Sequence, residues 1–324
     1  MSVLNILLVG SDELARSIAK KSDSRDVDNY VYKYLKEDGE FSTISILRPN
    51  NYPDKPKPFF TALTVSDFGI IEVSKVDASF GEVIVSMTCA GIKDGLIIIN
   101  PAEGEWVDES QVKSLAEQAG LDNWQFIGND GIIVREKLID VLNQIEDTKD
   151  EGFVVAVDQS FTVKGVGLVA VGHVQSGIVK KHDTIILAGS EGSAVARSLQ
   201  VMDLDVEVAH VGDRVGLAMR TAGAFREDLL GKGSILADCE SRFEIQSSSK
   251  FKLSKAFFQK NELRPGDVVH FCSDLQFIVG RITDISDEIL IDWDYPIILN
   301  KTSKRKPLVV QLEANPRIMG YGVF

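Results

Sequence analysis

The sequence predicts an α/β domain with a doubly wound parallel sheet, followed by two antiparallel β-barrels. In the first half of the chain, short apolar runs alternate with segments of helical spacing, which is typical of a sheet covered by helices on both faces. After residue 152 no helical period persists, and short strands separated by turns follow one another. The 324 residues are too many for one compact core and suit two or three domains.

The predicted α/β domain opens with a buried strand and a helix. Leu4–Val9 is a continuous apolar run, and Asp12–Lys21 follows with apolar residues at helical spacing. Tyr30–Leu35 and Thr43–Leu47 form a hairpin around a turn at residues 36–39, which adds an antiparallel edge. The other predicted strands are Gly69–Val73, Leu96–Ile99 and Trp124–Ile127, and the other helices are Pro58–Val65, Gly81–Ala90, Glu109–Ala119 and Ile133–Ile145.

Both predicted barrels consist of short strands bounded by turn residues. The polar linker Lys149–Gly152 precedes the first barrel, and the second begins near Cys239. The strands predicted for the first are Val154–Asp158, Gly167–Val174, Thr184–Ala188, Val195–Val201, Arg214–Arg220 and Ser234–Ala237. Those predicted for the second are Glu244–Phe251, Val268–Cys272, Val279–Ile285, Ile289–Trp293, Leu308–Glu313 and Arg317–Phe324.

Composition and charge exclude several classes of protein. Asp and Glu outnumber Lys and Arg by 48 to 35, so the net charge of −13 argues against DNA binding and against non-specific RNA binding. A local basic patch for one structured RNA stays compatible with it. No apolar run reaches the roughly 20 residues that span a membrane. The cysteines Cys89, Cys239 and Cys272 form no Cys-x-x-Cys pair, which fits a cytoplasmic protein without disulfides or a metal site.

The turn after the first strand is where a nucleotide phosphate would bind, because a helix N-terminus begins there. The phosphate-loop pattern requires Gly, four residues, Gly, Lys and then Ser or Thr. Gly10 and Ser17 fit this pattern, whereas Ala15 and Arg16 replace the second Gly and the Lys. Arg is bulkier and planar, so it is no equivalent of Lys at such a site. Two carboxylates within the same stretch also repel an anion. A degenerate phosphate loop and an ordinary strand–turn–helix both fit.

A glycine-rich signature opens the first predicted barrel. The run Asp158–Asp183 fills nearly every position of a pattern that begins D-x-x-F-x-(I/V)-x-G-x-G, and such glycines suit the tight turns of a small barrel. Through this run, Val211–Leu217 and Arg317–Val323, the chain resembles the elongation factor Tu family, above all the branch of the selenocysteine-specific elongation factor. The resemblance implies a P-loop GTPase-like G domain over 1–148, an elongation-factor domain 2-like β-barrel over 152–238 and a domain 3-like β-barrel over 239–324.

Compared with this family, every guanine-nucleotide motif is altered. Arg48–Asn51 stands where switch II, Asp-x-x-Gly, is expected, and the alternative Asp77–Gly81 is one residue too long. In Asn100–Glu103 the base-reading motif keeps its Asn but loses its Lys and Asp, and Gly128–Asp130 replaces the last motif. The resemblance therefore implies impaired or absent GTP binding and hydrolysis. It points to a group of archaeal, selenocysteine-factor-like elongation factors, for which a link to pyrrolysine has been suggested.

The resemblance implies a translation elongation factor-like protein that binds aminoacyl-tRNA or the ribosome. Gln200 and Arg220 lie on strands that contact the aminoacyl end in relatives, although a structural role in the barrel fits them equally. The basic run at residues 301–306 is either a phosphate-contacting loop or a solvated hairpin turn. Its basic residues are Lys301, Lys304, Arg305 and Lys306.

Two alternative functions stay open. One is an active GTP-binding translational GTPase with an unorthodox site, in which Arg16 clamps phosphate, Ser17 holds Mg²⁺ and Asn100 contacts the base beside Gly10. The other is a pseudo-GTPase scaffold that regulates a translation-factor protein partner. On the main hypothesis no cofactor is expected, and GTP or GDP binds with Mg²⁺ only if the degenerate site still works.

Overall fold

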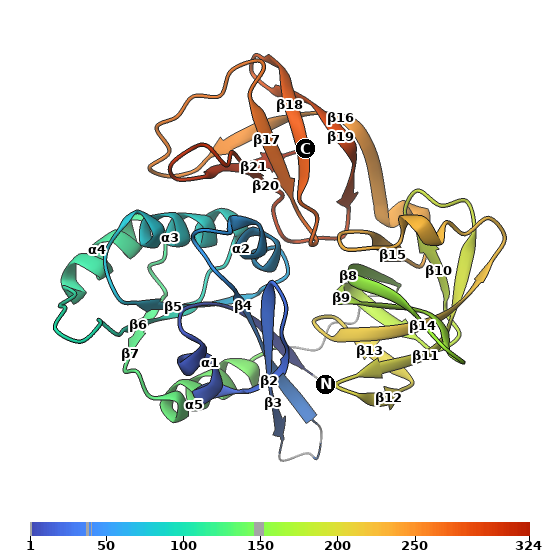
Figure 1. The fold of residues 1–324 in the computed structure, drawn as a ribbon, viewed down its shortest axis with the longest axis horizontal. Helices are drawn as coiled ribbons and strands as arrows, with labels where there is room; N and C mark the ends of the chain where they lie inside the picture. Colours follow the sequence, from blue (N-terminus) through green and yellow to red (C-terminus); the bar gives the residue numbers. More distant parts are fainter. Residues whose placement is uncertain (1, 37–38, 40, 146–151) are drawn as a thin grey trace.

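The computed structural model describes residues 2–36, 39, 41–145 and 152–324. An α/β domain is followed by two β-rich domains, and the three lie against one another (Figure 1). The predicted end of the first domain at residue 148, and the predicted linker except for Gly152, fall outside the described residues. The predicted division between Asp238 and Cys239 falls between β15 (Ile235–Ala237) and β16 (Phe243–Lys255).

The first domain contains a seven-stranded mixed sheet in the order β2-β3-β4-β1-β5-β6-β7. Five neighbouring strands from β4 to β7 run parallel, whereas β2, β3 and β4 pair antiparallel. The strands are β1 (Val3–Val9), β2 (Lys20–Asp23), β3 (Val27–Leu35), β4 (Phe41–Pro49), β5 (Phe68–Val73), β6 (Gly95–Ile99) and β7 (Gln125–Ile127). The helices are α1 (Asp12–Ile18), α2 (Pro56–Leu63), α3 (Ala78–Ala90), α4 (Glu109–Gln118) and α5 (Gly131–Leu142).

The central strand β1 explains why helices cover both faces of this sheet. Its side chains alternate between the faces, as in any strand. Leu4, Ile6 and Leu8 are buried in a cluster with residues of α1 and α5, and Leu7 is buried in a second cluster with residues of α2, α3 and α4. Figure 1 shows these two groups of helices on opposite sides of the sheet. An apolar run without alternation is what a strand buried on both faces requires.

The edge of the sheet differs from the prediction. The helix expected over Asp12–Lys21 ends at Ile18, and Lys20 begins the edge strand β2. This strand lies at the edge of the sheet, where it pairs with β3 and its side chains are exposed or half-buried. Its sequence, Lys-Lys-Ser-Asp, therefore shows no alternation of apolar and polar residues. The predicted hairpin is confirmed by the antiparallel pairing of β3 with β4, while residues 37, 38 and 40 of its connection lie outside the described part of the chain.

The second domain is an eight-stranded antiparallel assembly. Its main path is β10-β15-β8-β9-β14-β11-β12, β13 pairs with β9, and an additional pairing of β10 with β11 joins the path back on itself. Phe153, Val155 and Leu217 belong to its apolar core. Its elements are β8 (Phe153–Val163), β9 (Gly167–Lys180), β10 (Thr184–Leu187), β11 (Ser193–Val201), β12 (Leu204–Val206), β13 (Val208–His210), β14 (Arg214–Ala222), the 3₁₀ turn η1 (Glu227–Leu229) and β15.

The third domain is a closed barrel with the strand order β16-β19-β18-β17-β20-β21, in which β21 pairs with β16. Phe251, Phe271 and Trp293 fill its core. Besides the 3₁₀ turn η2 (Glu240–Arg242) and β16, its elements are β17 (Val268–Cys272), β18 (Ile278–Ile285), β19 (Ile289–Asn300), β20 (Leu308–Val310) and β21 (Ile318–Val323).

One apolar cluster runs through all three domains. Phe60 of α2, Ile235 of β15 and Leu308 of β20 are fully buried members of it, so the domains share an apolar interface. An interface of this kind restrains the relative motion of domains more than a polar one does. None of the helices in the described ranges is long and apolar enough to cross a membrane.

Candidate functional site

A cavity of about 450 Å³ lies at the carboxyl ends of β1, β5 and β6. This is the edge at which open α/β sheets bind their ligands. Two residues of the predicted nucleotide site, Gly10 and Asn100, line the cavity together with Ser11, Glu72 and Asp77. The cavity is therefore the candidate nucleotide site.

The stretch that matches the phosphate-loop pattern is mostly helical. Only Gly10 and Ser11 separate β1 from α1, which begins at Asp12. The Ser11 side chain caps the helix, since its Oγ accepts a hydrogen bond from the backbone N–H of Leu14 at 3.1 Å. A phosphate would accept from the same kind of backbone donor. The start of α1 thus uses internally one of the N–H groups that a phosphate loop would present.

Glu72 takes the position of an anion at the start of this helix. One of its carboxylate oxygens accepts from the backbone N–H of Ser11 at 2.5 Å, and the other accepts from Nδ2 of Asn100 at 2.7 Å. Gly10 makes room for Glu72, because a Cβ at position 10 would lie 2.8 Å from the Glu72 side chain. Gly10 and Asn100 are thus brought together, around a carboxylate of the protein itself.

A second carboxylate caps the next helix at this edge. Asp77 accepts from the backbone N–H groups of Ser79 and Phe80 at 3.0 and 3.1 Å, at the start of α3. Lys75 pairs with the same carboxylate at 2.9 Å. Burial alone would raise the pKa of Asp77, but the hydrogen bonds from Lys75 and Phe80 lower it. The candidate nucleotide site is therefore acidic, with its lysine already paired.

Arg16 and Ser17 lie outside this cavity. Arg16 is directed back along α1 and pairs with Asp12 at 2.5 Å, with half of its side chain exposed. Ser17 Oγ donates to the carbonyl of Leu14 at 2.7 Å, and a Cβ on Gly131 of α5 would collide with Ser17. The predicted phosphate clamp and Mg²⁺ ligand are thus not gathered with Gly10 and Asn100.

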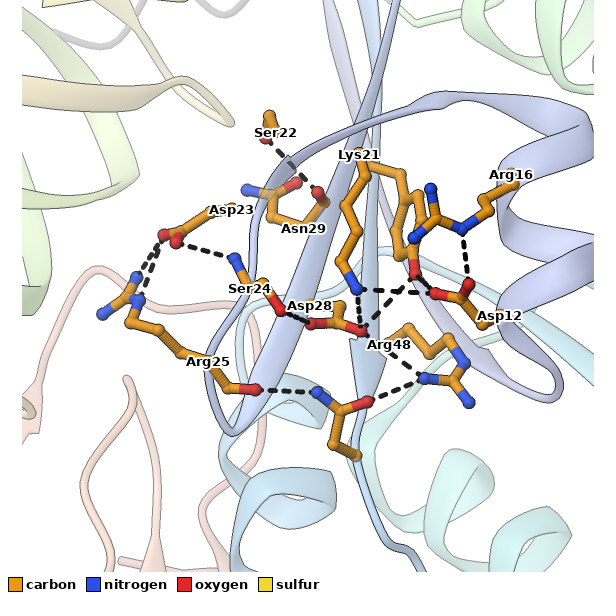
Figure 2. A network of polar contacts seen from close by, with 12 residues as sticks. Asp12, Arg16, Lys21, Ser22, Asp23, Ser24, Arg25, Asp28, Asn29 and Arg48 are labelled. Atoms are coloured by element: carbon orange, nitrogen blue, oxygen red, sulfur yellow. Dashed lines mark hydrogen bonds and ion pairs between the residues drawn. The ribbon is translucent and has the colours of Figure 1, made fainter.

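Asp12 is the centre of a polar network between α1, β2 and β3 (Figure 2). It accepts hydrogen bonds from Tyr30 and Arg16, and these hold the pKa of Asp12 well below its usual range. Lys21 links Asp12, at 3.5 Å, to Asp28, at 2.7 Å. Asp12 is thus paired with Arg16 of its own helix and with Tyr30 and Lys21 of the neighbouring strands.

Two residues of the stretch predicted to stand in place of switch II also join this network (Figure 2). Arg48 donates to the carbonyl of Gly10 at 2.8 Å and to the side chain of Asn50 at 2.7 Å. Asn50 in turn donates to the carbonyl of Arg25 at 2.7 Å. The loop before α2 is therefore tied to the start of α1 by side-chain hydrogen bonds.

The predicted RNA-contacting residues lie in two separate places. Gln200 on β11 is exposed and donates to Asp205 at 2.9 Å, and Arg220 on β14 is exposed at the opposite end of the same strand pair. The basic run lies in the connection between β19 and β20 of the third domain. There Lys301 lies 3.5 Å from Glu244, Lys306 lies over the ring of Tyr321 at 3.8 Å, and Lys304 is exposed.

Arg305 differs from the other basic residues of this run. Its guanidinium donates to Asp67 of the first domain and, at 2.5 Å, to Gln175 of the second. Only about a fifth of the side chain is exposed. Arg305 is thus a junction residue that joins the three domains.

Asp158, the first residue of the glycine-rich signature, is a second junction residue. Its carboxylate accepts from Arg25 of the first domain at 2.6 Å and from Arg214 of β14 at 3.0 Å. Burial would raise the pKa of Asp158, but Arg214, the neighbouring His173 and Arg25 lower it to about 2. The ion pair therefore persists at any physiological pH.

Glu82 forms the third junction contact. This buried carboxylate on α3 accepts from Tyr52 at 2.7 Å, and from the backbone N–H and Nε of Arg317 in the third domain at 2.7 and 3.1 Å. Burial and the neighbouring carboxylate raise the pKa of Tyr52 far above its usual value. Sequence reasoning missed Glu72, Glu82 and Asp158 as site or junction residues. The signal that could have found one of them was a lone carboxylate inside an otherwise apolar run, as Glu72 is in β5.

Comparisons with known proteins agree with this architecture. No family model matches the chain. An uncharacterized protein of Methanocaldococcus jannaschii is 29% identical over 288 residues, which cover 88% of this chain and 88% of that protein. The selenocysteine-specific elongation factor of the same organism is 27% identical over 172 residues, or 52% of this chain and 36% of that protein.

Solved structures extend the likeness to the whole chain. Translation elongation factor SelB from Methanococcus maripaludis matches with a TM-score of 0.77 in its apo form and 0.78 with the GTP analogue GPPNHP. Both matches have 18% identity and cover 99% of this chain and 79% of the other. The chain has the fold of these elongation factors. A bacterial selenocysteine-specific elongation factor matches with a TM-score of 0.75 and 18% identity, and 58% of its length is covered.

Proposed function

We propose that this protein is a translation elongation factor-like protein that binds aminoacyl-tRNA or the ribosome and does not use guanine nucleotide to set its domain arrangement. The observation that carries the proposal is the contact of Glu72 with the N–H of Ser11 and with Asn100. A carboxylate of the chain fills the place where a helix N-terminus would receive a phosphate. The factor fold argues for the translation role, and the altered site argues against the nucleotide.

Electrostatic repulsion supports the proposal that the protein does not use guanine nucleotide. A phosphate oxygen placed about 4 Å from the Glu72 carboxylate is repelled by about 4 kcal/mol at an effective dielectric constant of about 20. Asp77 adds a second negative charge to the same cavity, and the charge of Lys75 is already shared with it. Phosphate-binding sites of GTPases rely instead on backbone N–H groups, a Lys and Mg²⁺.

The junction contacts support the view that the domains need no nucleotide to stay together. Asp158 with Arg25, Glu82 with Arg317, and Arg305 with Asp67 each join two domains by a charged hydrogen bond. A nucleotide switch requires an element whose two arrangements differ in free energy by little, so that the ligand can shift the balance. These direct contacts favour one arrangement.

For the RNA contact we propose the exposed residues among those predicted, namely Gln200, Arg220, Lys301, Lys304 and Lys306. Arg305 is assigned to the junction instead, because it donates to Asp67 and Gln175 and only about a fifth of its side chain is exposed. Aminoacyl-tRNA, the ribosome and a translation-factor protein partner all remain in the proposal. Binding of this kind depends on phosphate contacts and weakens with salt.

The alternative of a working GTP site has one observation in its favour, the cavity that Gly10 and Asn100 still line. Calorimetric titration with GTP and GDP, with and without Mg²⁺, separates the two proposals. We expect no heat of binding for the wild-type protein, and measurable binding for Glu72→Ala if the carboxylate alone blocks the site. The control is Glu13→Ala, which removes an exposed carboxylate in the first turn of α1. Wild-type binding at about micromolar strength, or about −8 kcal/mol, would overturn the proposal.

The translation role is tested by gel shift with aminoacylated tRNA at low salt. We expect a shift that is the same with and without GTP. A shift that appears only with GTP would support the working GTPase, and no shift at low salt would remove the tRNA hypothesis. Protein partners that survive RNase treatment in a pull-down would favour the scaffold.

A further inference from the structure

A second basic surface lies at the outer edge of the first domain. It is a groove of about 880 Å³ between the end of α1, the strands β2 and β3, helix α5 and the turn between β11 and β12 of the second domain. In that turn, Met202 and Asp203 both have positive φ angles, of 54° and 62°. Lys33 Nζ donates to the carbonyl of Met202 at 3.2 Å and so joins the two sides of the groove.

The groove is positively charged, whereas the protein as a whole is negatively charged. The chain carries −13 overall, yet five cations and one carboxylate line this surface. The cations are Arg16, Lys20, Lys21, Lys33 and Arg135, and the carboxylate is Asp203. A local concentration of cations in an acidic protein attracts polyanions to that place and leaves the rest of the surface repellent.

The cations differ in how far they are already neutralised. Arg16 pairs with Asp12 and Lys21 with Asp28, so these two contribute little free charge. Lys20 and Lys33 are exposed, and the ammonium of Lys33 has further N–H donors besides the one given to Met202. Lys20 and Lys33 are therefore the residues that an incoming phosphate would meet.

The wall of the groove contains an aromatic platform. The guanidinium of Arg135 lies over the ring of Tyr32 at 4.7 Å and donates to the carbonyls of Ser17 and Ile18 at 2.6 and 2.7 Å. These hydrogen bonds hold Arg135 in place over the ring. Planar guanidinium and aromatic groups beside lysines are the combination on which nucleic-acid bases stack while the backbone is neutralised.

The edge strand offers a different partner, a β-strand of another protein, but its form argues against one. β2 has only four residues, and its pairing with β3 shifts register between Lys21 and Asp23. Short, charged and bulged edge strands are those that resist the addition of a further strand. Lysines on the edge strand would be enough to prevent the addition of a further strand. A groove that is bounded by the second domain and lined by Tyr32 is not needed for that purpose.

We propose that this groove binds the phosphodiester backbone of RNA, with Lys20 and Lys33 as the phosphate contacts. The inference rests on the proposed RNA-binding function and adds a surface distinct from the β19–β20 connection. Because one wall belongs to the first domain and the other to the second, the groove exists only in the assembled arrangement. RNA binding in the groove would therefore indicate that the first and second domains are in contact.

The test measures binding of a structured RNA, an unfractionated tRNA pool, by fluorescence anisotropy over a series of salt concentrations. The variant is Lys20→Gln with Lys33→Gln. The control is Lys93→Gln with Lys113→Gln, which changes the net charge equally at exposed positions on the α3–β6 turn and on α4, over the other face of the sheet. Each lysine that no longer neutralises a phosphate should reduce the slope of log K against log salt by about 1, so we expect a reduction of about 2 for the groove variant and none for the control.

Three outcomes separate the hypotheses. A reduced slope in the groove variant alone supports the inference. Equal slopes in wild type, groove variant and control, with RNA bound, overturn the groove while leaving the proposed function intact. No RNA binding by the wild-type protein at low salt overturns both. Thermal unfolding of the groove variant guards against misfolding, and Tyr32→Leu provides a second variant, which should weaken binding without changing the salt slope.

Discussion

The carboxyl edge of the first sheet and the junctions between domains both rely on carboxylates, but with different partners. At the edge, Glu72 accepts from a backbone N–H and an amide of its own domain, and is half-buried. At the junctions, Asp158 and Glu82 accept from arginines, with Arg25 and Arg317 contributed across a domain boundary. The edge carboxylate links Ser11 and Asn100 within one domain, whereas the junction carboxylates join domains.

The difference has an energetic consequence. Removing one partner of a buried ion pair leaves an uncompensated charge and is strongly destabilising, whereas removing a half-buried cap mainly loses a hydrogen bond. Stability should therefore reside in the junctions, while the edge should be open to substitution. Substitutions at both places test this contrast, and the greatest loss of stability is expected at a junction.

Asp158→Asn should lower the free energy of unfolding by about 2 to 3 kcal/mol, because Arg25 and Arg214 lose a largely buried charged partner, although both keep Asp23. Urea unfolding monitored by circular dichroism measures it. The control is Asp228→Asn, which breaks the exposed pair with Arg226 and should leave the midpoint unchanged within error. Equal stability of Asp158→Asn and wild type would mean that the domains are held by apolar contacts alone.

Asp213 of the second domain is a buried carboxylate that forms no ion pair with an arginine of the described residues, and its pKa moves the opposite way. Burial raises the pKa of Asp213 to about 6, although the N–H of His210 donates to it at 2.7 Å. The folded protein therefore holds this proton until about pH 6, whereas the unfolded chain releases it near 4. The contribution of Asp213 to stability falls as pH rises through that window, by about 3 kcal/mol.

Asp213→Asn tests whether stability falls as the pH rises through this window. Relative to wild type, the variant should gain about 3 kcal/mol of stability between pH 4 and pH 7, because an amide cannot ionise. Unfolding free energies of both proteins at several pH values give the difference. A gap between the two proteins that does not change with pH would show that Asp213 ionises in the folded protein as it does in the unfolded chain.

Glu72→Ala should lower the free energy of unfolding by about 1 to 2 kcal/mol, because the hydrogen bonds with Ser11 and Asn100 are removed. Thermal unfolding measures the change, and Asn100→Ala removes one of the two hydrogen bonds for comparison. A loss as large as that of Asp158→Asn would erase the contrast between edge and junction.

Arg16→Ala should have the smallest effect. Its partner Asp12 is exposed and keeps its contacts with Tyr30 and Lys21, so the unfolding midpoint should stay within error of wild type. GTP-dependent phosphate release, measured with a no-protein control, should also be the same for both proteins. A variant that loses phosphate release present in the wild type would place Arg16 in a working nucleotide site.

Several features could be predicted from neighbouring residues. The apolar run of β1, the hairpin of β3 and β4, and the strands of the third-domain barrel follow from patterns that repeat within a few positions, since side-chain alternation and turn chemistry are local properties. The edge strand β2 was missed for the same reason, because four polar residues paired on one side carry no pattern.

The site could be predicted only in part. Gly10 and Asn100 do meet at the carboxyl edge, because parallel strands bring their ends together. The Glu72 carboxylate between them became visible only when β5 was placed beside β1. Likewise, the sequence marks residues 301–306 as a basic run, but it does not distinguish Arg305 from its neighbours.

By itself, then, the sequence determined the order of an α/β domain and two β-rich domains, and it predicts altered nucleotide motifs. Tertiary structure alone decided which charges meet. Arg25 and Asp158 are 133 positions apart, and Asp67 and Arg305 are 238 positions apart. Propensity and periodicity act over a few residues, whereas an ion pair depends on where folding brings two distant side chains, and on how much water the fold leaves around them.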